Sequence, residues 1–376
     1  MSTQVIINML QILLLALAVS FLMGLLLIRY NHLHAHFSTD HDVSGVQKFH
    51  ATPVPRIGGL PIMLGLVAGC ALSGFLNSTG WVLLLLLSAL PAFSAGFIED
   101  LTKKIGPLPR LLATFIAAAL GYFLLGAGLL RLDIPLVDGV LTHYWWLSLL
   151  LTMVAVGGVA HAVNIIDGYN GLSGMVAVFI FLAIAYVCFK VQDIVLMSVC
   201  FAMVGAILGF LFWNFPRGLI FAGDGGAYLI GFMIAELSVL LVARNPAVSP
   251  WFPLLCVIYP VFETVFSIYR RKFLQGRAVG YPDALHLHQM IYKRMVLWMV
   301  GSKEARHLTQ RNSMTSPYLW VLASFSVVPA MLFWNRTWIL MLLVLLFVLA
   351  YLRLYRMIVR FKTPRWMVLR RDDSSR

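Results

Sequence analysis

Four acidic residues lie in short polar stretches between long apolar runs, and they are the first candidates for chemistry. They are Glu99, Asp100, Asp167 and Asp224. Acids at such places are informative because the 376-residue chain has only 15 Asp and Glu residues. Glu99 and Asp100 end an apolar run, where two carboxylates face an unfavourable helix dipole and favour a nearby cation. A solvated helix end, with Lys103 and Lys104 as partners, is the alternative interpretation.

A second polar stretch separates two further apolar runs. Asn164, Asp167 and Asn170 follow one another at steps of three, so they can share one face of a helix. Gly168 and Gly171 allow a break in that helix or a close approach to a ligand. A polar cluster of this kind between membrane spans indicates function rather than structural filler.

The third stretch begins at Asn214 and ends in Phe221-Ala-Gly-Asp-Gly-Gly226. The glycines free backbone N–H groups beside Asp224, just before a predicted helix start. That arrangement suits a phosphate or a metal–phosphate pair. Ordinary turns use the same residues, so the interpretation depends on the other acids nearby.

The ligands offered by these stretches are carboxylate and amide oxygens, which suit Mg²⁺ or Mn²⁺ and disfavour zinc. The four cysteines lie inside apolar runs without metal-ligand spacing, which argues against a disulfide framework or a zinc site. His286 and His288 could bind phosphate or sugar, or lie on a solvated helix. Basic residues that could surround phosphates, or simply set the topology, are Lys48, Arg56, Arg110, Arg270, Arg271 and Arg277.

The elements that must position these residues are membrane helices. The chain is 61% hydrophobic and only 11% charged, a composition typical of an all-α polytopic membrane protein. We predict eleven transmembrane helices, each of about 20 residues. Their ranges are 5–28, 58–76, 80–98, 110–130, 144–162, 171–189, 193–212, 226–243, 250–268, 317–335 and 337–355.

The positive charges predict the orientation. With the N-terminus outside and the C-terminus in the cytoplasm, 24 of the 28 Lys and Arg residues fall on the cytoplasmic side. The net charge of +13 then indicates topology and anionic lipid rather than a nucleic-acid partner. We predict one catalytic domain over 1–355 and a basic cytoplasmic tail over 356–376. The cytoplasmic loops are 29–57, 99–110, 163–170, 213–225 and 269–316, and apolar residues within 281–300 predict a helix on the membrane surface.

Five motifs together resemble the polyprenyl-phosphate N-acetylhexosamine-1-phosphate transferases, the group that includes MraY and WecA. The resemblance covers residues 1 to about 355, and its combined motifs are specific. In chain order the motifs are Lys48-Phe-His-Ala-Thr-Pro-Val-Pro-Arg56-Ile-Gly-Gly59, Gly96-Phe-Ile-Glu99-Asp100 with Arg110, Asn164-Ile-Ile-Asp167-Gly-Tyr-Asn170-Gly171, Phe221-Ala-Gly-Asp224-Gly-Gly226, and Gly276-Arg277 followed by Pro282-Asp-Ala-Leu-His286-Leu-His288.

The resemblance implies Mg²⁺-dependent transfer of a sugar 1-phosphate from a UDP-amino sugar to a polyprenyl phosphate, in the bacterial inner membrane with the site on the cytoplasmic face. It also implies a helical fold that often dimerises. Asp224 would be the main metal ligand and Asn164 its companion. Glu99, Asp100 and Asp167 would complete the catalytic acids. Substrate-binding residues would be Lys48, Arg56, Arg110, Asn170, Asn214, Arg277, His286 and His288.

Three positions depart from the family pattern. The usual Asp-Asp pair reads Glu99-Asp100, which leaves open which acid carries a proton or a metal. Asn170 replaces a second acid and cannot act as a base. Gln289 stands where a further His is common, and the lack of three consecutive histidines favours the WecA-like branch. The departures keep an inactive scaffold open as an alternative. An ion-coupled transporter is the other alternative; it predicts acids at mid-membrane and inverted repeats, and only Glu236 and Glu263 lie deep within spans.

Overall fold

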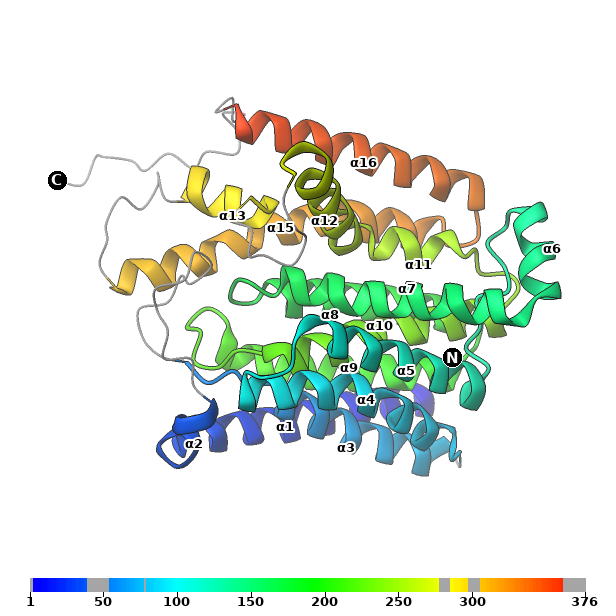
Figure 1. Cartoon of the computed structure of the whole chain (residues 1–376). Helices are drawn as coiled ribbons and strands as arrows, with labels where there is room; N and C mark the ends of the chain where they lie inside the picture. The colour runs from blue at the N-terminus through cyan, green and yellow to red at the C-terminus, as the bar shows by residue number, and fades with distance from the viewer. Residues whose placement is uncertain (1–2, 39–53, 78, 277–284, 297–304, 361–376) are drawn as a thin grey trace.

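The computed structural model describes residues 3–38, 54–77, 79–276, 285–296 and 305–360, and the described residues form helices joined by turns (Figure 1). The helices are α1 (Thr3–Arg29), α2 (Asn31–Ser38), α3 (Gly59–Asn77), α4 (Trp81–Thr102), α5 (Pro107–Leu125), α6 (Pro135–His143), α7 (Trp145–Ile166), α8 (Leu172–Lys190), α9 (Ile194–Asn214), α10 (Gly223–Arg244), α11 (Trp251–Cys256), α12 (Ile258–Tyr269), α13 (Leu287–Ile291), α15 (Ala305–Leu332) and α16 (Thr337–Val359), with π-helical turns η1 (Arg270–Leu274) and η2 (Tyr292–Val296).

Ten of these helices are long and apolar enough to cross a membrane, which confirms a polytopic helical fold. The difference from the eleven predicted spans lies at 250–268, where α11 and α12 share the segment and meet at Val257. Pro260 explains the break, because proline has no N–H to bond the carbonyl four residues earlier and its ring clashes with that carbonyl.

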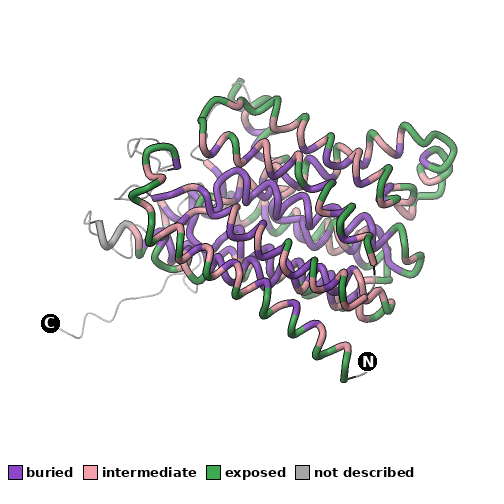
Figure 2. Tube along the Cα trace, turned by 90° about the horizontal axis from the view of Figure 1, so that it is seen from below, coloured by how far each residue is buried: buried purple, intermediate pink, exposed green. Residues whose placement is uncertain are grey.

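Helix α10 forms the centre of the bundle. Nearly all of its residues are buried, and it contacts α3, α4, α5, α7, α8 and α9. The outward faces of α1 and α16 carry exposed leucines instead. Figure 2 shows this distribution, with buried segments in the middle and exposed ones around them. An apolar outer face is what a bilayer requires of a helix that borders it.

The polar turns of interest gather at one end of the bundle. Helices α4, α7 and α9 end there, and α5, α8 and α10 begin there, while α6 lies at the opposite end (Figure 1). Tyr144, Trp145 and Trp146 are exposed beside α6, as expected for aromatic side chains at a membrane–water interface. The assignment of the first end to the cytoplasm stays a prediction from the charge asymmetry.

Three predictions for the segments after residue 280 differ from the structure. The prediction of a surface helix within 281–300 is wrong for its described part, because Leu287, Met290 and Ile291 of α13 are buried against neighbouring helices. Helix α15 begins at Ala305 and continues through Pro317, twelve residues before the predicted span. Helix α16 reaches Val359, past the predicted start of the tail at 356, and residues 361–376 lie outside the described chain.

Candidate active site

Asp224 stands at the start of α10, where the chain makes a turn that only glycine allows. Gly223 has a φ of +69°, in the left-handed region. A Cβ at this position would also collide with the backbone carbonyl of Arg56 and with the side chain of Asp100. The glycine therefore lets α10 begin directly beneath two other segments, and Asp224 follows it into that junction.

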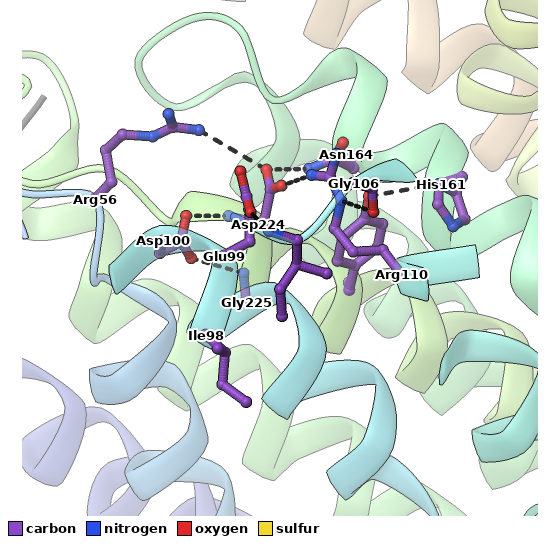
Figure 3. Close-up of polar contacts among 12 residues, drawn as sticks. Arg56, Ile98, Glu99, Asp100, Gly106, Arg110, His161, Asn164, Asp224 and Gly225 are labelled. Carbon is purple, nitrogen blue, oxygen red and sulfur yellow. Dashed lines mark hydrogen bonds and ion pairs between the residues drawn. The ribbon is translucent and has the colours of Figure 1, made fainter. Parts of the chain in front are cut away.

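Three side chains converge on the Asp224 carboxylate from separate helices and loops (Figure 3). Arg110 of α5 donates a hydrogen bond to Oδ2. Asn164 of α7 donates from Nδ2 to Oδ1 at 2.9 Å, and the Arg56 guanidinium lies 3.8 Å from the same oxygen. Only 8% of Asp224 is exposed, so these charges interact with little screening by water. Four residues predicted from the sequence as site residues are thus brought together.

Asp100 lies beside Asp224 but binds backbone. Its Oδ1 accepts the Asp224 N–H at 2.9 Å and its Oδ2 accepts the Gly225 N–H at 2.8 Å. These are orphan N–H groups of the first turn of α10, which a carboxylate satisfies well. Asp100 is 4% exposed. The structure therefore gives Asp100 the task of fixing the Asp224 turn to α4, and its predicted catalytic role stays a prediction.

Glu99 takes a different position from its neighbour. Its Oε2 accepts the N–H of Ile105 at 2.5 Å, across the turn that joins α4 to α5. Lys103 has a φ of 55° in this turn and caps α4 through the Glu99 carbonyl. Glu99 is half-buried, whereas Asp100 is buried. Of the two acids, Glu99 is the one whose second carboxylate oxygen accepts no hydrogen bond from the described residues.

Asp167 begins the turn 167–171 between α7 and α8. The Ser173 hydroxyl donates a hydrogen bond to its Oδ1. Burial raises the pKa of the Asp167 carboxyl to about 6, against the opposing effects of Ser173 and of the Arg56 charge. The influence of Arg56 on both Asp167 and Asp224 indicates that the two acids belong to one electrostatic environment.

Asn170 and Asn214, both predicted to bind substrate, are buried and hold loops together. Asn170 donates from Nδ2 to the Pro216 carbonyl at 3.2 Å. Asn214 accepts the Gly171 N–H at 2.6 Å and donates to the Ile220 carbonyl at 2.8 Å. The two amides thus connect the turn 167–171 to the link before Asp224. Their predicted contact with substrate stays a prediction.

Sequence reasoning missed the contribution of α15 to this region. Asn312 accepts the Asn170 N–H at 2.7 Å, and the Ser316 hydroxyl donates to the Asn170 carbonyl at 2.6 Å. The Trp320 indole N–H donates to the Gly171 carbonyl at 3.0 Å. We refer to Asn312, Ser316 and Trp320 as the α15 contacts. Their signal in the sequence is polar residues at helical spacing, four apart, before an apolar run.

The predicted histidines lie in a buried group around Glu263. Glu263 accepts hydrogen bonds from the Leu287 N–H at 3.0 Å and from the Tyr351 hydroxyl at 2.5 Å. His286 Nδ1 lies 3.0 Å from the same carboxylate, and its ring stacks on that of His288 with centroids 5.2 Å apart. Glu263 thus positions the start of α13. Lys48 and Arg277, the other predicted binding residues, lie outside the described chain.

Comparison with known proteins places this site in a family. The model for glycosyl transferase family 4 matches residues 82–242. A decaprenyl-phosphate N-acetylglucosaminephosphotransferase from Mycobacterium tuberculosis (strain ATCC 25618 / H37Rv) is 30% identical over 291 residues, which cover 66% of this chain and 69% of the relative. The chain belongs to glycosyl transferase family 4.

Two further similar proteins are named as phospho-sugar transferases. A probable undecaprenyl-phosphate N-acetylglucosaminyl 1-phosphate transferase from Bacillus subtilis (strain 168) is 29% identical over 65% of this chain and 67% of its own. A phospho-N-acetylmuramoyl-pentapeptide-transferase from Streptococcus suis (strain 05ZYH33) is 28% identical over 62% of this chain and 74% of its own. The resemblance to the MraY and WecA group is therefore confirmed.

The family 4 resemblance implies a divalent cation, and the donors around Asp224 are chemically suited to one. Asp224 and Asn164 offer carboxylate and amide oxygens, the hard ligands that Mg²⁺ takes. No three His, Cys, Asp or Glu side chains in the described part of the chain come together as a metal cage. One carboxylate completed by substrate phosphates is the usual arrangement for Mg²⁺. The residues present therefore fit a cation that arrives with a phosphate substrate.

Proposed function

We propose that this protein transfers an N-acetylhexosamine 1-phosphate, by default N-acetylglucosamine 1-phosphate, from a UDP-sugar to undecaprenyl phosphate. UMP leaves, and the lipid diphosphate sugar that remains begins an envelope polysaccharide. The observation that carries the proposal is the convergence of Arg56, Arg110 and Asn164 on Asp224 at one end of a membrane bundle. Family membership supports a transferase over an ion-coupled transporter.

The chemistry asks the protein to bring two anions together. A phosphate oxygen of the lipid attacks the β-phosphorus of the UDP-sugar, and the bond from that phosphorus to the oxygen it shares with UMP breaks. The lipid phosphate is anionic near neutral pH, so strong base help is unnecessary. Arg56 and Arg110 supply fixed positive charge where negative charge gathers.

Each acid then has a separate task. Asp224 and Asn164 would hold Mg²⁺ or Mn²⁺, which when bound neutralises phosphate charge. Asp100 keeps the Asp224 turn against α4 through its two backbone hydrogen bonds. Glu99, with one carboxylate oxygen unbound by the described residues, is the better placed of the pair to orient or deprotonate the acceptor.

The proposed setting is the bacterial inner membrane, with the Asp224 end in the cytoplasm. The lipid would enter the site from the bilayer and the nucleotide from water. The homodimer expected from the resemblance stays a prediction, and light scattering on the detergent-purified chain would test it.

One assay tests the proposed function. Purified protein is incubated with undecaprenyl phosphate and a panel of labelled UDP-sugars, with Mg²⁺, with Mn²⁺ or with a chelator. We expect UMP release that the chelator abolishes and that Asp224→Ala reduces by about 10²- to 10³-fold, as loss of a principal charge-stabilising group does.

The matched control is Asp193→Ala, which removes an acid at the start of α9, at the opposite end of the bundle. This variant should keep the transfer activity. If no UDP-sugar in the panel yields UMP with the wild-type chain, the proposed transferase function is wrong and the inactive scaffold becomes the better explanation.

A further inference from the structure

Arg311 of α15 is a buried arginine for which the described residues provide no hydrogen-bond or ion-pair partner. The residue is 2% exposed, and its Nε and Nη2 make no hydrogen bond in the described part of the chain. A buried guanidinium is unfavourable unless it is paired and hydrogen-bonded. Arg270, by comparison, is 5% exposed and donates to the Tyr355 hydroxyl at 3.0 Å. Arg311 therefore carries a positive charge that the described residues do not neutralise.

The surroundings of Arg311 are polar and aromatic. Burial raises the pKa of the Tyr292 hydroxyl and the positive charge of Arg311 opposes that rise, so the guanidinium lies near this side chain. The Tyr292 ring is 5.5 Å from the Tyr169 ring, and the Tyr169 ring is 5.5 Å from that of His288. His288 is 2% exposed, and its Nδ1 makes no hydrogen bond in the described structure. Two unsatisfied polar groups thus belong to one cluster.

The acids close to this cluster are engaged elsewhere. Glu263 accepts hydrogen bonds from the Leu287 N–H and the Tyr351 hydroxyl. Asp167 accepts one from Ser173. Burial lowers the pKa of His288 to about 3, so this ring is uncharged at neutral pH. Among the described residues, Arg311 is the member of this cluster whose charge has no counter-ion, and an anion is the ligand that would neutralise it.

The cluster also adjoins the site described above. Asn164, at the end of α7, bonds Asp224. Gly168 follows Asn164 by four residues and lies in the turn 167–171 between α7 and α8. A Cβ placed on Gly168 would lie 3.6 Å from His288 Nε2. Asn312, the residue after Arg311, accepts a hydrogen bond from the turn 167–171. A ligand that extends from Asp224 past this turn would therefore approach His288 and Arg311.

We infer that Arg311, together with the Nδ1 of His288, forms a second anion subsite, which takes a phosphate group of a substrate on the α13–α15 side of the turn 167–171. Guanidinium and imidazole N–H groups are suitable donors for phosphate oxygens. The inference deepens the proposed function and depends on it. The phosphate could belong to the nucleotide diphosphate or to the lipid phosphate, and both present the same chemistry to Arg311.

The test uses the full chain in detergent with Arg311→Met and Arg311→Lys. The Michaelis constant for UDP-N-acetylglucosamine is measured at saturating undecaprenyl phosphate, and the constant for undecaprenyl phosphate at saturating nucleotide sugar. We expect Arg311→Met to raise one of the two at least about tenfold, as loss of a charged hydrogen-bond partner does. The constant that rises identifies the source of the phosphate. Arg311→Lys should lie between Arg311→Met and the wild type.

Thermal unfolding without substrate separates binding from a structural role. Arg311→Met should unfold at the same temperature as the wild type or higher, because methionine removes a buried unpaired charge. Arg270→Met is the matched control and should unfold at a lower temperature, because it removes a hydrogen-bonded arginine. Both Michaelis constants within twofold of the wild type, or a lower unfolding temperature for Arg311→Met, would overturn the inference.

A binding measurement keeps the inference separate from the proposed function. If the wild-type chain turns over no UDP-sugar, inorganic pyrophosphate is titrated against wild type and Arg311→Met. Weaker binding to the variant by about tenfold or more would still support an anion subsite at Arg311. Equal binding, or none to either protein, would contradict it.

Discussion

At the scale of single residues, adjacent acids in the sequence have unequal surroundings. Asp100 binds two backbone N–H groups of α10, while Glu99 binds one across the turn to α5. Asp224 instead faces side chains of opposite or neutral charge. The departure from the family's Asp-Asp pair therefore falls on Glu99, which has the less engaged carboxylate. Asp100, which fixes the start of α10, keeps the family's residue.

The role of Asp100 predicts an effect on stability. Asp100→Asn should lower the free energy of unfolding by about 1–3 kcal/mol, because an amide group would face one of the two N–H donors with its own N–H₂. Transfer activity should fall together with stability. The measurement is thermal unfolding alongside UMP release.

Glu99→Gln serves as the comparison, because it keeps an acceptor for the Ile105 N–H. It should unfold within a few degrees of the wild type and lose activity without loss of stability. If Asp100→Asn were as stable as Glu99→Gln, the helix-start role of Asp100 would be wrong.

The raised pKa of Asp167 predicts a pH dependence. Its ordinary value is 3.8 and its value in the folded protein is about 6. The folded chain therefore binds more protons than the unfolded chain between these values, and the contribution of Asp167 to stability falls as pH rises from about 4 to about 6. Activity should rise over pH 5 to 7, since the carboxylate forms there.

Ser173 donates to this carboxylate and lowers its pKa. We expect Ser173→Ala to move the acidic limb of the pH–activity profile to higher pH. Ser326→Ala is the control, because that hydroxyl bonds only the Ala323 carbonyl of its own helix in the described structure. A limb that does not move with Ser173→Ala would exclude Asp167 as the group that titrates.

At the scale of helices, the site depends on how closely α4 and α10 approach each other. A Cβ on Gly96 would lie 2.5 Å from the Asp224 carbonyl carbon and 2.6 Å from the Gly225 nitrogen. A Cβ on Gly225 would lie 2.9 Å from the Phe97 nitrogen. Each helix therefore presents a glycine to the backbone of the other, and Asp100 reaches the first turn of α10 because of this contact.

The contact predicts that Gly96→Ala will separate the two helices. The added methyl group meets backbone atoms, which cannot rotate away, so we expect a loss of about 1–3 kcal/mol in stability and a large loss of activity. Gly158→Ala on α7 is the matched control, because a Cβ there has open space within 4 Å. Equal activity of the two variants would contradict the close-contact interpretation.

The sequence could predict the side chains that surround Asp224, but not the hydrogen bonds that join distant helices around them. Asp224, Asn164 and Arg110 belong to short motifs, and the structure brings them together. Asn170 and Asn214 are predicted to bind substrate, because a sequence does not distinguish an amide that joins two loops from an amide that binds a ligand. Their partners come from distant helices, which one sequence without measured contacts does not specify.

Helix boundaries differ from the predicted ones in two segments, where a proline or a polar stretch interrupts the apolar pattern. The segment 250–268 has the length of one span, and Pro260 divides it between α11 and α12. The polar stretch before Pro317 predicts a loop, but its side chains bond the turn 167–171 and allow α15 to begin at Ala305. Tertiary hydrogen bonds outweighed local composition at this position.

At the scale of the whole molecule, the bundle places its polar turns at one end, and the orientation of that end can be measured. The cysteines at 70, 188, 200 and 256 are buried, so they provide little background for thiol labelling. Gly106 and Gly139 lie at opposite ends, and a Cβ at either meets no atom within 4 Å.

We expect a membrane-impermeant maleimide to label Gly139→Cys in intact cells. Gly106→Cys should react only after the membrane is opened, because the predicted orientation places it in the cytoplasm. Labelling of Gly106→Cys alone in intact cells would show the opposite orientation, and would place the proposed nucleotide site on the wrong side for a cytoplasmic UDP-sugar.

The α15 contacts also determine when, during synthesis, the turn 167–171 can form all of its hydrogen bonds. The acceptor of the Asn170 N–H is the Asn312 side chain, which lies 142 residues further along the chain. Translation proceeds from the N-terminus, so Asp224, Asn164 and Arg110 are all made while the turn 167–171 still lacks its last supports. A nascent chain that stops after α12 would contain every residue around Asp224, but its turn 167–171 would lack the three hydrogen bonds from α15. The turn 167–171 therefore acquires its full set of hydrogen bonds when α15 has been made.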